Sequence, residues 1–456
     1  MHESNVQAYN DRGIELRAQG KLREAVAAFS EGIVAFPNAA VLYNNLAISL
    51  DELGAPKEAL LAYESALLRA PSWVPALVGK GNLLMRDGKL EQARSFFERA
   101  LDVQPGSVAA NLALYELLQI AGDPQRAIEH QRRALEAQQL YSSRAPNEAR
   151  SLLVLCAPGD WQANVPVDFL IDRSTTSVHK LYLLDETRMR AARLPRYDAV
   201  LCAIAESPEA AAPLRLAQSF LAAQERPALN RPERVLATGR LELARTLAGA
   251  GCTVAPVAQV ERAALAAGAL PFAYPFILRP VGSHAGHDLE RIGGAADLAA
   301  YLAKTSARSL FASPFVDYRS ADGHFRKYRI VYVDGEPFPV HLAVSPNWMI
   351  HYYNAPMAEH QWMRDEEAAF LADWESAFAG SLGEAVRGVG REVGLEYFGI
   401  DCAIGPDGRL LVFEADPAML VHTTDPAELY PYKHRYVPRI YRAFEAMVDR
   451  RKGADT

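Results

Sequence analysis

The residues most suited to carry out chemistry are two carboxylates that the sequence places face to face. Residues 399–404 and 410–415 have the apolar character of strands, and Asp407-Gly408 between them is a strong hairpin signal. With these two residues as the loop, the strands pair so that Asp401 lies directly opposite Glu414. The sequence therefore predicts a carboxylate pair on one face of a hairpin.

A third carboxylate, Asp416, lies two residues after Glu414 and so on the same face of the predicted strand. Like charges directly opposite one another are destabilising, and a dry carboxylate pair without compensation shifts its pKa. A bound cation removes that conflict, and oxygen-only ligands on rigid strands suit Mg²⁺ or Mn²⁺ shared with substrate phosphates. We therefore expect Asp401, Glu414 and Asp416 to be metal ligands, with an exposed acidic hairpin as the alternative.

The composition is that of an ordinary globular protein. The chain has 456 residues, half of them apolar and 23% charged, which gives a prior of about three domains at roughly 150 residues each. A net charge of −7, and the lack of a Lys and Arg cluster interleaved with aromatics, argue against a nucleic-acid partner.

The four cysteines lie far apart and form no zinc or disulfide pattern, so reduced, buried thiols are expected. The N-terminus is polar and has no signal-peptide pattern. The most apolar stretch, residues 264–278, is too short and too broken by Gly and Pro to span a bilayer. We therefore expect a cytoplasmic protein without a membrane partner.

The elements of the first third repeat with a period of 34 residues. The recurring residues are a Gly at the turn between two helices, an Ala at their close crossing, an aromatic on the same helical face and a Pro after the second helix. They are Gly20, Gly54, Gly88 and Gly122; Ala25, Ala59, Ala93 and Ala127; Phe29, Tyr63 and Phe97; and Pro37, Pro71 and Pro105.

This pattern resembles the tetratricopeptide repeat, in four units over residues 1–140. The last unit has Gln131 for the aromatic and Gln139 for the proline, as a polar end cap would. The resemblance implies a superhelix whose concave face binds a peptide or protein. Its groove positions are Asn10, Asn44, Asn82 and Arg86. Packing against the rest of the chain, or homodimer formation, is the alternative.

Helical periodicity stops after the repeats, and residues 141–150 are predicted to be a linker that includes the segment 141–147. Strand signals at 151–157, 178–184 and 199–204, followed by a helix at 213–223, favour a small parallel α/β domain over residues 151–235.

Residues 238–251 predict an amphipathic helix that ends at Gly251, followed by a strand at 253–257. A further strand ends in Arg279 and leads into a loop rich in Gly, Ser and His. Glycines in such a loop permit close backbone approach, and successive N–H groups can cradle phosphate oxygens. Because many loops between strands contain two glycines, this feature alone does not establish a phosphate-binding site.

The order of these features resembles the ATP-grasp superfamily, most nearly its carboxylate-amine ligase branch, over residues 150–445. A cation at Arg240, a strand cation at Arg279, the Gly-rich loop, Arg329 and the carboxylate hairpin follow one another as in that family. The resemblance implies an α/β subdomain at 151–235 and α+β lobes at 236–311 and 312–450, with ATP and Mg²⁺ (or Mn²⁺) between the lobes.

The resemblance also assigns roles to single residues. Arg240 and Arg279 stand where the family usually has phosphate-binding lysines, and Arg329 matches the arginine that stabilises the transferring phosphoryl group. Asp401 and Glu414 match its metal-bridging acids, and Asp416 stands at its usual Asn position. The remaining implied nucleotide contacts are Gly282, Ser283, His284, Ala285 and Gly286 in the loop, and Ser313 and Phe315 in the adenine-binding hinge.

The segment 341–357 departs most from the family, because it lacks the usual further Arg and Gly-rich turn. Its imidazoles, amides and aromatics suggest a substrate cavity, with His341, Asn347, His351 and Asn354 as candidate contacts. The family reading thus implies a ligase that activates a carboxylate as an acyl phosphate and joins it to an amine on a substrate recruited by the repeats. The alternative is a nucleotide-binding scaffold with a degenerate ATP-grasp domain.

Overall fold

The computed structural model describes residues 2–283, 286–350 and 354–452. The chain divides into two compact units. The first contains Met1–Gln139 and Pro158–Asp160, and the second contains Leu140–Ala157 and Trp161–Thr456. In the part of the chain that is described, no helix is both long enough and apolar enough to cross a membrane.

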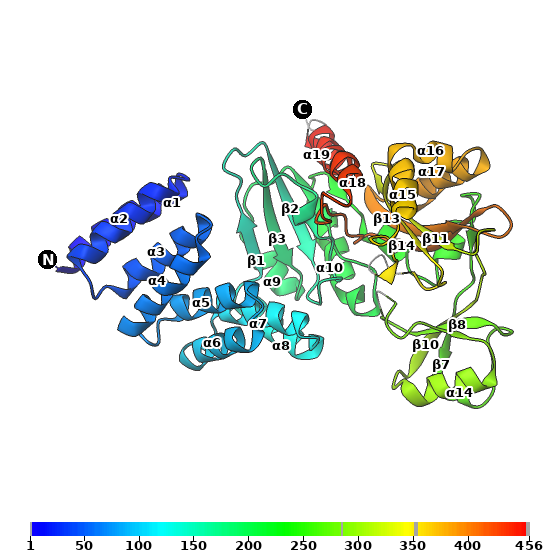
Figure 1. Cartoon of the computed structure of the whole chain (residues 1–456), viewed down its shortest axis with the longest axis horizontal. Coiled ribbons are helices and arrows are strands. Elements are labelled where there is room, and N and C mark those ends of the chain that lie inside the picture. Colours follow the sequence, from blue (N-terminus) through cyan, green and yellow to red (C-terminus); the bar gives the residue numbers. More distant parts are fainter. Residues whose placement is uncertain (1, 284–285, 351–353, 453–456) are drawn as a thin grey trace. The chain divides into compact units, whose positions relative to one another are not determined.

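The first unit is an array of helix pairs (Figure 1). Its helices are α1 (His2–Ala18), α2 (Leu22–Ala35), α3 (Ala40–Glu52), α4 (Pro56–Arg69), α5 (Val74–Arg86), α6 (Leu90–Val103), α7 (Val108–Ile120) and α8 (Pro124–Ala137).

The recurring residues explain the geometry of the array. The four turn glycines all have positive φ, between +73° and +82°, and the four recurring alanines are fully buried. A Cβ on Gly13 or Gly81 would lie within 2.4 Å of the ring of Phe29 or Phe97, so these glycines let each helix contact the aromatic side chain of the next.

Two expectations for the repeats are wrong. Gln131 is not an exposed cap: its side chain is buried and accepts a hydrogen bond from the backbone of Gly159. Asn10 and Asn44 are not open to a groove. Both are buried, and Asn10 accepts from Asn45 at 2.6 Å. Asn44 donates to Asn45 at 3.3 Å, whereas Asn44 Oδ1 accepts no hydrogen bond within the described residues.

The second unit begins with a five-stranded sheet in the order β1-β3-β2-β4-β5. Strands β2 to β5 are parallel, and β1 pairs antiparallel with β3. The elements are β1 (Leu140–Ser143), β2 (Arg150–Cys156), η1 (Val167–Phe169), β3 (Thr176–Tyr182), α9 (Glu186–Ala191), β4 (Ala199–Cys202), η2 (Pro208–Ala210), α10 (Ala211–Ala222) and β5 (Ala228–Leu229).

The predicted linker at residues 141–150 and the predicted helix at residues 238–251 both differ from the structure. The predicted linker begins within β1, because the backbone of Leu140–Ser143 completes the sheet edge. The helix predicted over 238–251 is reduced to α12 (Leu243–Thr246), preceded by α11 (Pro232–Leu236). Gly251 does adopt positive φ, +75°, after it.

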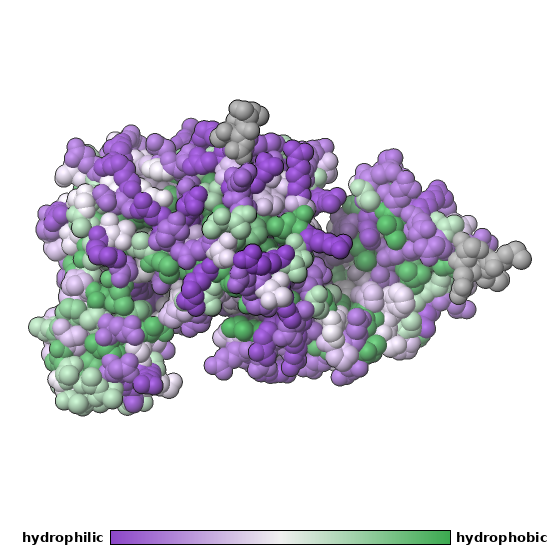
Figure 2. Space-filling model, turned by 180° about the vertical axis from the view of Figure 1, so that it is seen from behind, coloured by the Kyte–Doolittle hydropathy of each residue, from purple (hydrophilic) through white to green (hydrophobic). Residues whose placement is uncertain are grey.

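A four-stranded antiparallel sheet, β7-β10-β8-β9, forms a small lobe with its own apolar core (Figure 1). Seen from behind, this lobe carries many apolar side chains on its surface (Figure 2). Its elements are β7 (Ala258–Glu261), α13 (Arg262–Ala266), β8 (Phe276–Pro280), β9 (Glu290–Ile292), α14 (Ala295–Lys304) and β10 (Ser309–Pro314). The predicted boundary between residues 311 and 312 falls inside β10.

The third sheet has the order β12-β11-β13-β14-β6. Its elements are β6 (Thr253–Val254), β11 (Phe325–Val333), β12 (Glu336–Ser345), α15 (Gln361–Ala372), α16 (Trp374–Ala377), α17 (Ser381–Val393), β13 (Tyr397–Ile404), β14 (Leu410–Asp416), α18 (Pro431–Tyr436) and α19 (Pro438–Lys452). One apolar core joins this sheet to the first.

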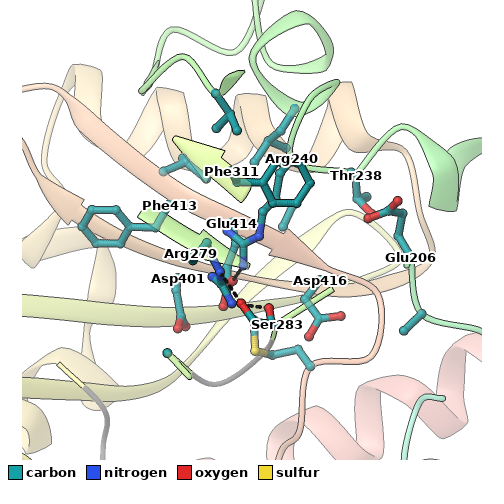
Figure 3. Close-up of a pocket in the computed structure, with 18 of the residues that line it drawn as sticks. Glu206, Thr238, Arg240, Arg279, Ser283, Phe311, Asp401, Phe413, Glu414 and Asp416 are labelled. Carbon is teal, nitrogen blue, oxygen red and sulfur yellow. Dashed lines mark hydrogen bonds and ion pairs between the residues drawn. The ribbon is translucent and has the colours of Figure 1, made fainter. Parts of the chain in front are cut away.

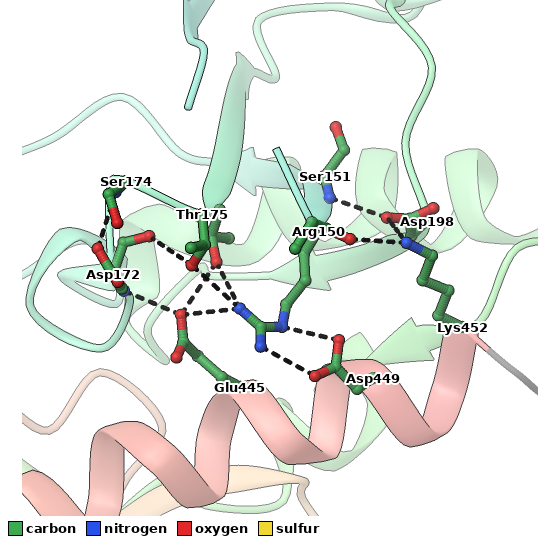
Figure 4. A network of polar contacts seen from close by, with 11 residues as sticks. Arg150, Ser151, Asp172, Ser174, Thr175, Asp198, Glu445, Asp449 and Lys452 are labelled. Atoms are coloured by element: carbon green, nitrogen blue, oxygen red, sulfur yellow. Dashed lines mark hydrogen bonds and ion pairs between the residues drawn. The ribbon is translucent and has the colours of Figure 1, made fainter. Parts of the chain in front are cut away.

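Helix α19 also ties the two sheets together through charge. Arg150 on β2 donates to Asp449 at 2.7 and 2.9 Å and to Glu445 at 3.2 Å (Figure 4). The next two residues of the helix, Arg450 and Arg451, both pair with Asp334, at the turn between β11 and β12. The helix therefore holds the first and third sheets in a fixed relation.

Candidate functional site

A cavity of about 1530 Å³ lies in the second unit, where parts of all three sheets meet. The small lobe contributes Arg279 and Ser313, and the third sheet contributes Arg329 and Glu414. Loops at the carboxyl ends of the first sheet's strands complete the wall. Figure 3 shows charged side chains from several elements pointing toward one another here.

The hairpin pairs Asp401 with Glu414 as predicted, but its loop and register differ from the predicted ones. Asp401 does lie opposite Glu414, but from Cys402↔Val412 onward the register is shifted by one residue. The loop is three residues long, because Gly405 donates to Arg409 and Gly408 has φ +74°. The prediction of a two-residue loop is therefore wrong. The extra residue of the loop is balanced by a bulge at Phe413, which restores the pair.

Asp401 is the most strongly held of the three carboxylates. It is 2% exposed and accepts from Lys327 Nζ at 2.9 Å and from Arg329 at 2.8 and 3.0 Å. Burial opposes its ionisation, but the charges of Arg329 and Lys327 outweigh burial and hold the pKa of Asp401 well below its usual range. This carboxylate is ionised and already neutralised by protein cations.

Glu414 accepts from Arg240 Nη2 at 2.6 Å. Arg279, on β8, lies in the same wall and is 9% exposed. Burial, and then the neighbouring charge of Arg240, lower the pKa of Arg279 to about 10. Its guanidinium donates to Ser283, through both the hydroxyl at 3.0 Å and the carbonyl. These arginines form a cationic wall that can face an anion.

Asp416 differs from the other two because it accepts a hydrogen bond from a backbone amide, Ala418 N, at 2.7 Å. Burial and the charge of Glu414 raise the pKa of Asp416 to about 6. Within the described residues, no three His, Cys, Asp or Glu side chains are arranged to hold a metal ion. Lys327 and Arg329 bind Asp401, and Arg240 binds one oxygen of Glu414, so a hard divalent cation beside these carboxylates would need further oxygens from a ligand.

The Gly-rich loop and the hinge also line the cavity. Gly282 and Gly286 have φ of +77° and +72°, and Ser283, which follows Gly282, accepts a hydrogen bond from Arg279. His284 and Ala285 lie outside the described residues. Ser313 is buried in the wall, and Phe315 contributes its side chain there while its N–H donates to Pro275 O.

The predicted acceptor residues are only partly brought together. His341 lines the cavity opposite Arg329 on the neighbouring strand, and burial followed by the Arg329 charge holds its pKa well below the usual range. Asn347 and Asn354 are exposed and are not among the described residues that line the cavity, so the structure does not bring these two predicted substrate contacts to the site. His351 lies outside the described residues.

Sequence reasoning missed several charged residues of the wall, among them Lys327, Lys433 and Glu206. Lys327 lies two residues before Arg329 and so on the same face of β11, a signal that strand periodicity could have found. Lys433, on α18, pairs with Asp425 at 3.0 Å and Glu367 at 3.3 Å. Glu206 follows β4. The last two depend on tertiary packing and gave no local signal.

The comparisons with known proteins concern the repeats. A family profile described as tetratricopeptide repeat matches residues 10–72 and 78–142. The N-terminal region is a tetratricopeptide array. Repeats of this kind build extended binding surfaces for other proteins. A search of curated proteins gives no match.

Several solved structures resemble the array. One is the second tetratricopeptide domain of human RPAP3 in complex with an HSP70 peptide. It is 27% identical over 25% of this chain and 96% of its own, with a TM-score of 0.24. PilF of Pseudomonas aeruginosa is 20% identical over 30% of this chain and 62% of its own, with a TM-score of 0.29. A repeat protein of Parabacteroides merdae is 24% identical over 29% and 52%, with a TM-score of 0.27.

Proposed function

We propose that the second unit is an ATP-dependent ligase that activates a carboxylate as an acyl phosphate and joins it to an amine. The observation that supports this most is the convergence of Arg240, Arg279 and Arg329 with Glu414 and Asp416 on one cavity. Cations from separate elements beside acceptor-only carboxylates suit a triphosphate with a divalent ion. The resemblance to the ATP-grasp superfamily is part of this proposal.

Each part of the wall has a role in it. Arg279, held by Ser283, and the Gly282 and Gly286 backbone would bind phosphate oxygens. Arg329 and Lys327 would stabilise charge on the transferring phosphoryl group. Mg²⁺ or Mn²⁺ on Glu414 and Asp416 would supply charge neutralisation when bound.

The proposed reaction balances in two steps. An oxygen of the substrate carboxylate bonds to the γ-phosphorus, and the bond from that phosphorus to the bridging oxygen breaks as ADP leaves with the electron pair. The amine nitrogen then bonds to the acyl carbon, inorganic phosphate leaves with the electrons of the broken carbon–oxygen bond, and the nitrogen gives up a proton. The arginines act by position and charge, as phosphoryl transfer requires.

A second candidate is a nucleotide-binding scaffold with a degenerate ATP-grasp domain. One observation favours it: Arg329 and Arg240 are both bonded to carboxylates, Asp401 and Glu414, rather than open to phosphate. Such a scaffold would bind ATP without forming ADP. The ligase needs at least one of these pairs to open when the nucleotide enters.

The test is ADP formation with Mg²⁺ and mixtures of carboxylates and amines. We expect Glu414→Gln to lower the rate by about 10²-fold, because it removes a carboxylate ligand of the proposed divalent ion. Glu336→Gln, an exposed carboxylate at the start of β12, is the matched control and should be unchanged. Equal ADP formation by the wild type and Glu414→Gln would refute the role of the hairpin; ATP binding without any ADP would favour the scaffold.

We also propose that the repeats recruit a peptide or protein that carries the substrate. Asn82 and Arg86 are exposed on α5, and Arg86 pairs with Asp51. An amide and a guanidinium can bind an extended backbone. Tethering the reactive group near the cavity would raise its effective concentration without new contacts at the site of chemistry.

A further inference from the structure

The first sheet has a topological switch point between β2 and β4. The chain leaves β2 toward β3 on one side of the sheet and leaves β4 toward β5 on the other side. All four of these strands are parallel, so both connections start at the same edge. In open α/β sheets, ligands bind in the crevice outside the carboxyl ends of the strands at this point.

Backbone bonds hold the two connections together at the switch point. Val165 donates to Ala203 O at 2.6 Å and Ala205 donates to Ala163 O at 2.9 Å, and Asn164 and Ile204 form a bridge. These bonds place the residues just beyond them, in both connections, in the wall of the cavity. The crevice and the cavity of the carboxylate hairpin are therefore one continuous space.

Glu206 is a half-buried carboxylate in this wall. Among the described residues it has no hydrogen bond or ion pair, and the cation whose charge acts on it, Arg240, is bonded to Glu414. A Cβ on Gly239 would lie 3.0 Å from the Glu206 Cδ, so the glycine leaves room for the carboxylate. Figure 3 shows Glu206 beside Thr238 at the side of the site. A partly desolvated carboxylate without a partner suits a cationic ligand.

Two aromatic side chains from the other connection line the same space. Trp161 is 55% exposed and Phe169 is 47% exposed, although both are large apolar residues. Exposed aromatic surface in a cavity indicates a ligand with an apolar part, and aromatic faces also attract ammonium groups.

We propose that Glu206, Trp161 and Phe169 form a subsite, here called the switch-point subsite, for a protonated primary amine with an apolar or aromatic group next to the nitrogen. This deepens the proposed function, on which its role as the acceptor site rests. Chemistry of this kind is found in an amino acid with an apolar side chain or at the amino end of a peptide. The subsite lies in the same cavity as Arg329 and His341, so amine and activated carboxylate can meet.

The test uses the full chain and two probes of matched shape, 2-phenylethylamine and 2-phenylethanol, with ligand-observed NMR to measure affinity. We expect the amine to bind in the millimolar range and the alcohol at least about tenfold more weakly, because only the amine makes a charge-assisted hydrogen bond. Glu206→Gln should weaken amine binding by about tenfold, and Trp161→Ala, at an exposed position, should also weaken it.

Glu225→Gln is the matched control, because Glu225 is an exposed carboxylate that follows α10 in the same sheet layer and does not line the cavity. It should bind the amine like the wild type. Equal amine affinity of the wild type and Glu206→Gln, equal affinity for amine and alcohol, or no binding of the amine would each overturn the subsite. ATP binding by the same proteins should be unchanged by Glu206→Gln. Failure of ATP to bind any of them would refute the proposed ligase while leaving the amine result to stand by itself.

Discussion

Charge compensation separates the three hairpin carboxylates at the scale of single residues. Asp401 has two cations and Glu414 has one, whereas Asp416 has a backbone amide. Of the three hairpin carboxylates, Asp416 is therefore the one whose ionisation is unfavourable in the folded protein. A group of this kind is expected where a cationic ligand completes the site.

The stability of the ligand-free protein should depend on pH through Asp416. Its pKa rises from about 4 in the unfolded chain to about 6 in the folded protein. Below about pH 4 both states are protonated and the carboxyl has no effect; as the pH rises through about 6, the folded state becomes less stable. Asp416→Asn should then stabilise the protein by about 1–2 kcal/mol at about pH 8, allowing for water in the cavity, and by nothing at about pH 4.

Urea unfolding at both pH values, with a chelator present, measures this difference. Asp407→Asn, at the exposed turn of the same hairpin, serves as the control and should show no such change with pH. A stabilisation by Asp416→Asn of the same size at both pH values would show that charge is not its cause.

At the scale of elements, helix α19 decides how the first and third sheets are held. Its acidic residues bind Arg150 on one side, and its basic residues bind Asp334 on the other. The Arg150 and Glu445 side chains are 16% and 15% exposed, so water screens this pair less than a surface pair. Because the cavity lies where the sheets meet, the helix fixes the distance between residues that come from different sheets.

Arg150→Met should lower the free energy of unfolding by about 1–3 kcal/mol, because it leaves Glu445 and Asp449 without their cation. Arg190→Met provides the comparison: its pair with Glu186 is 62% and 57% exposed, and its loss should cost about 0.5 kcal/mol or less. Denaturant midpoints of both variants measure the effect. Equally small losses would mean that the α19 contact contributes no more than a surface ion pair.

At the scale of the whole molecule, the chain joins a repeat array to a unit with a large charged cavity. The division between the two units falls at Gln139 and Leu140, apart from the short segment Pro158–Asp160. The repeat array and the second unit have separate apolar cores. The proposed recruitment role predicts that they also have separable functions.

Removal of residues 1–139 should raise KM for a macromolecular substrate by at least about tenfold, because the tethered substrate loses its effective concentration. ATP binding by the shortened protein should stay the same, which also checks that its second unit is folded. Steady-state kinetics with a protein-borne substrate measure the change. An unchanged KM would remove the support for recruitment by the repeats.

Features that depend on local contacts could be predicted from the order of residues. The repeats could be predicted because every helix pair contacts its sequence neighbours, so spacing alone gives the turn glycines and the buried Ala25 and Phe29. Asp401 and Glu414 could be paired because a short hairpin joins them, although the loop and the bulge were both missed and their effects cancelled.

Tertiary structure alone decided which charges meet. Arg240 and Glu414 are 174 residues apart, and no local pattern fixes their distance or shows that Lys327 and Arg329 both bind Asp401. The same holds for Glu206, which reaches the cavity because of strand order, and for Asn347, which does not. A side chain's partner is set by how distant elements pack, whereas periodicity records only the face of its own element.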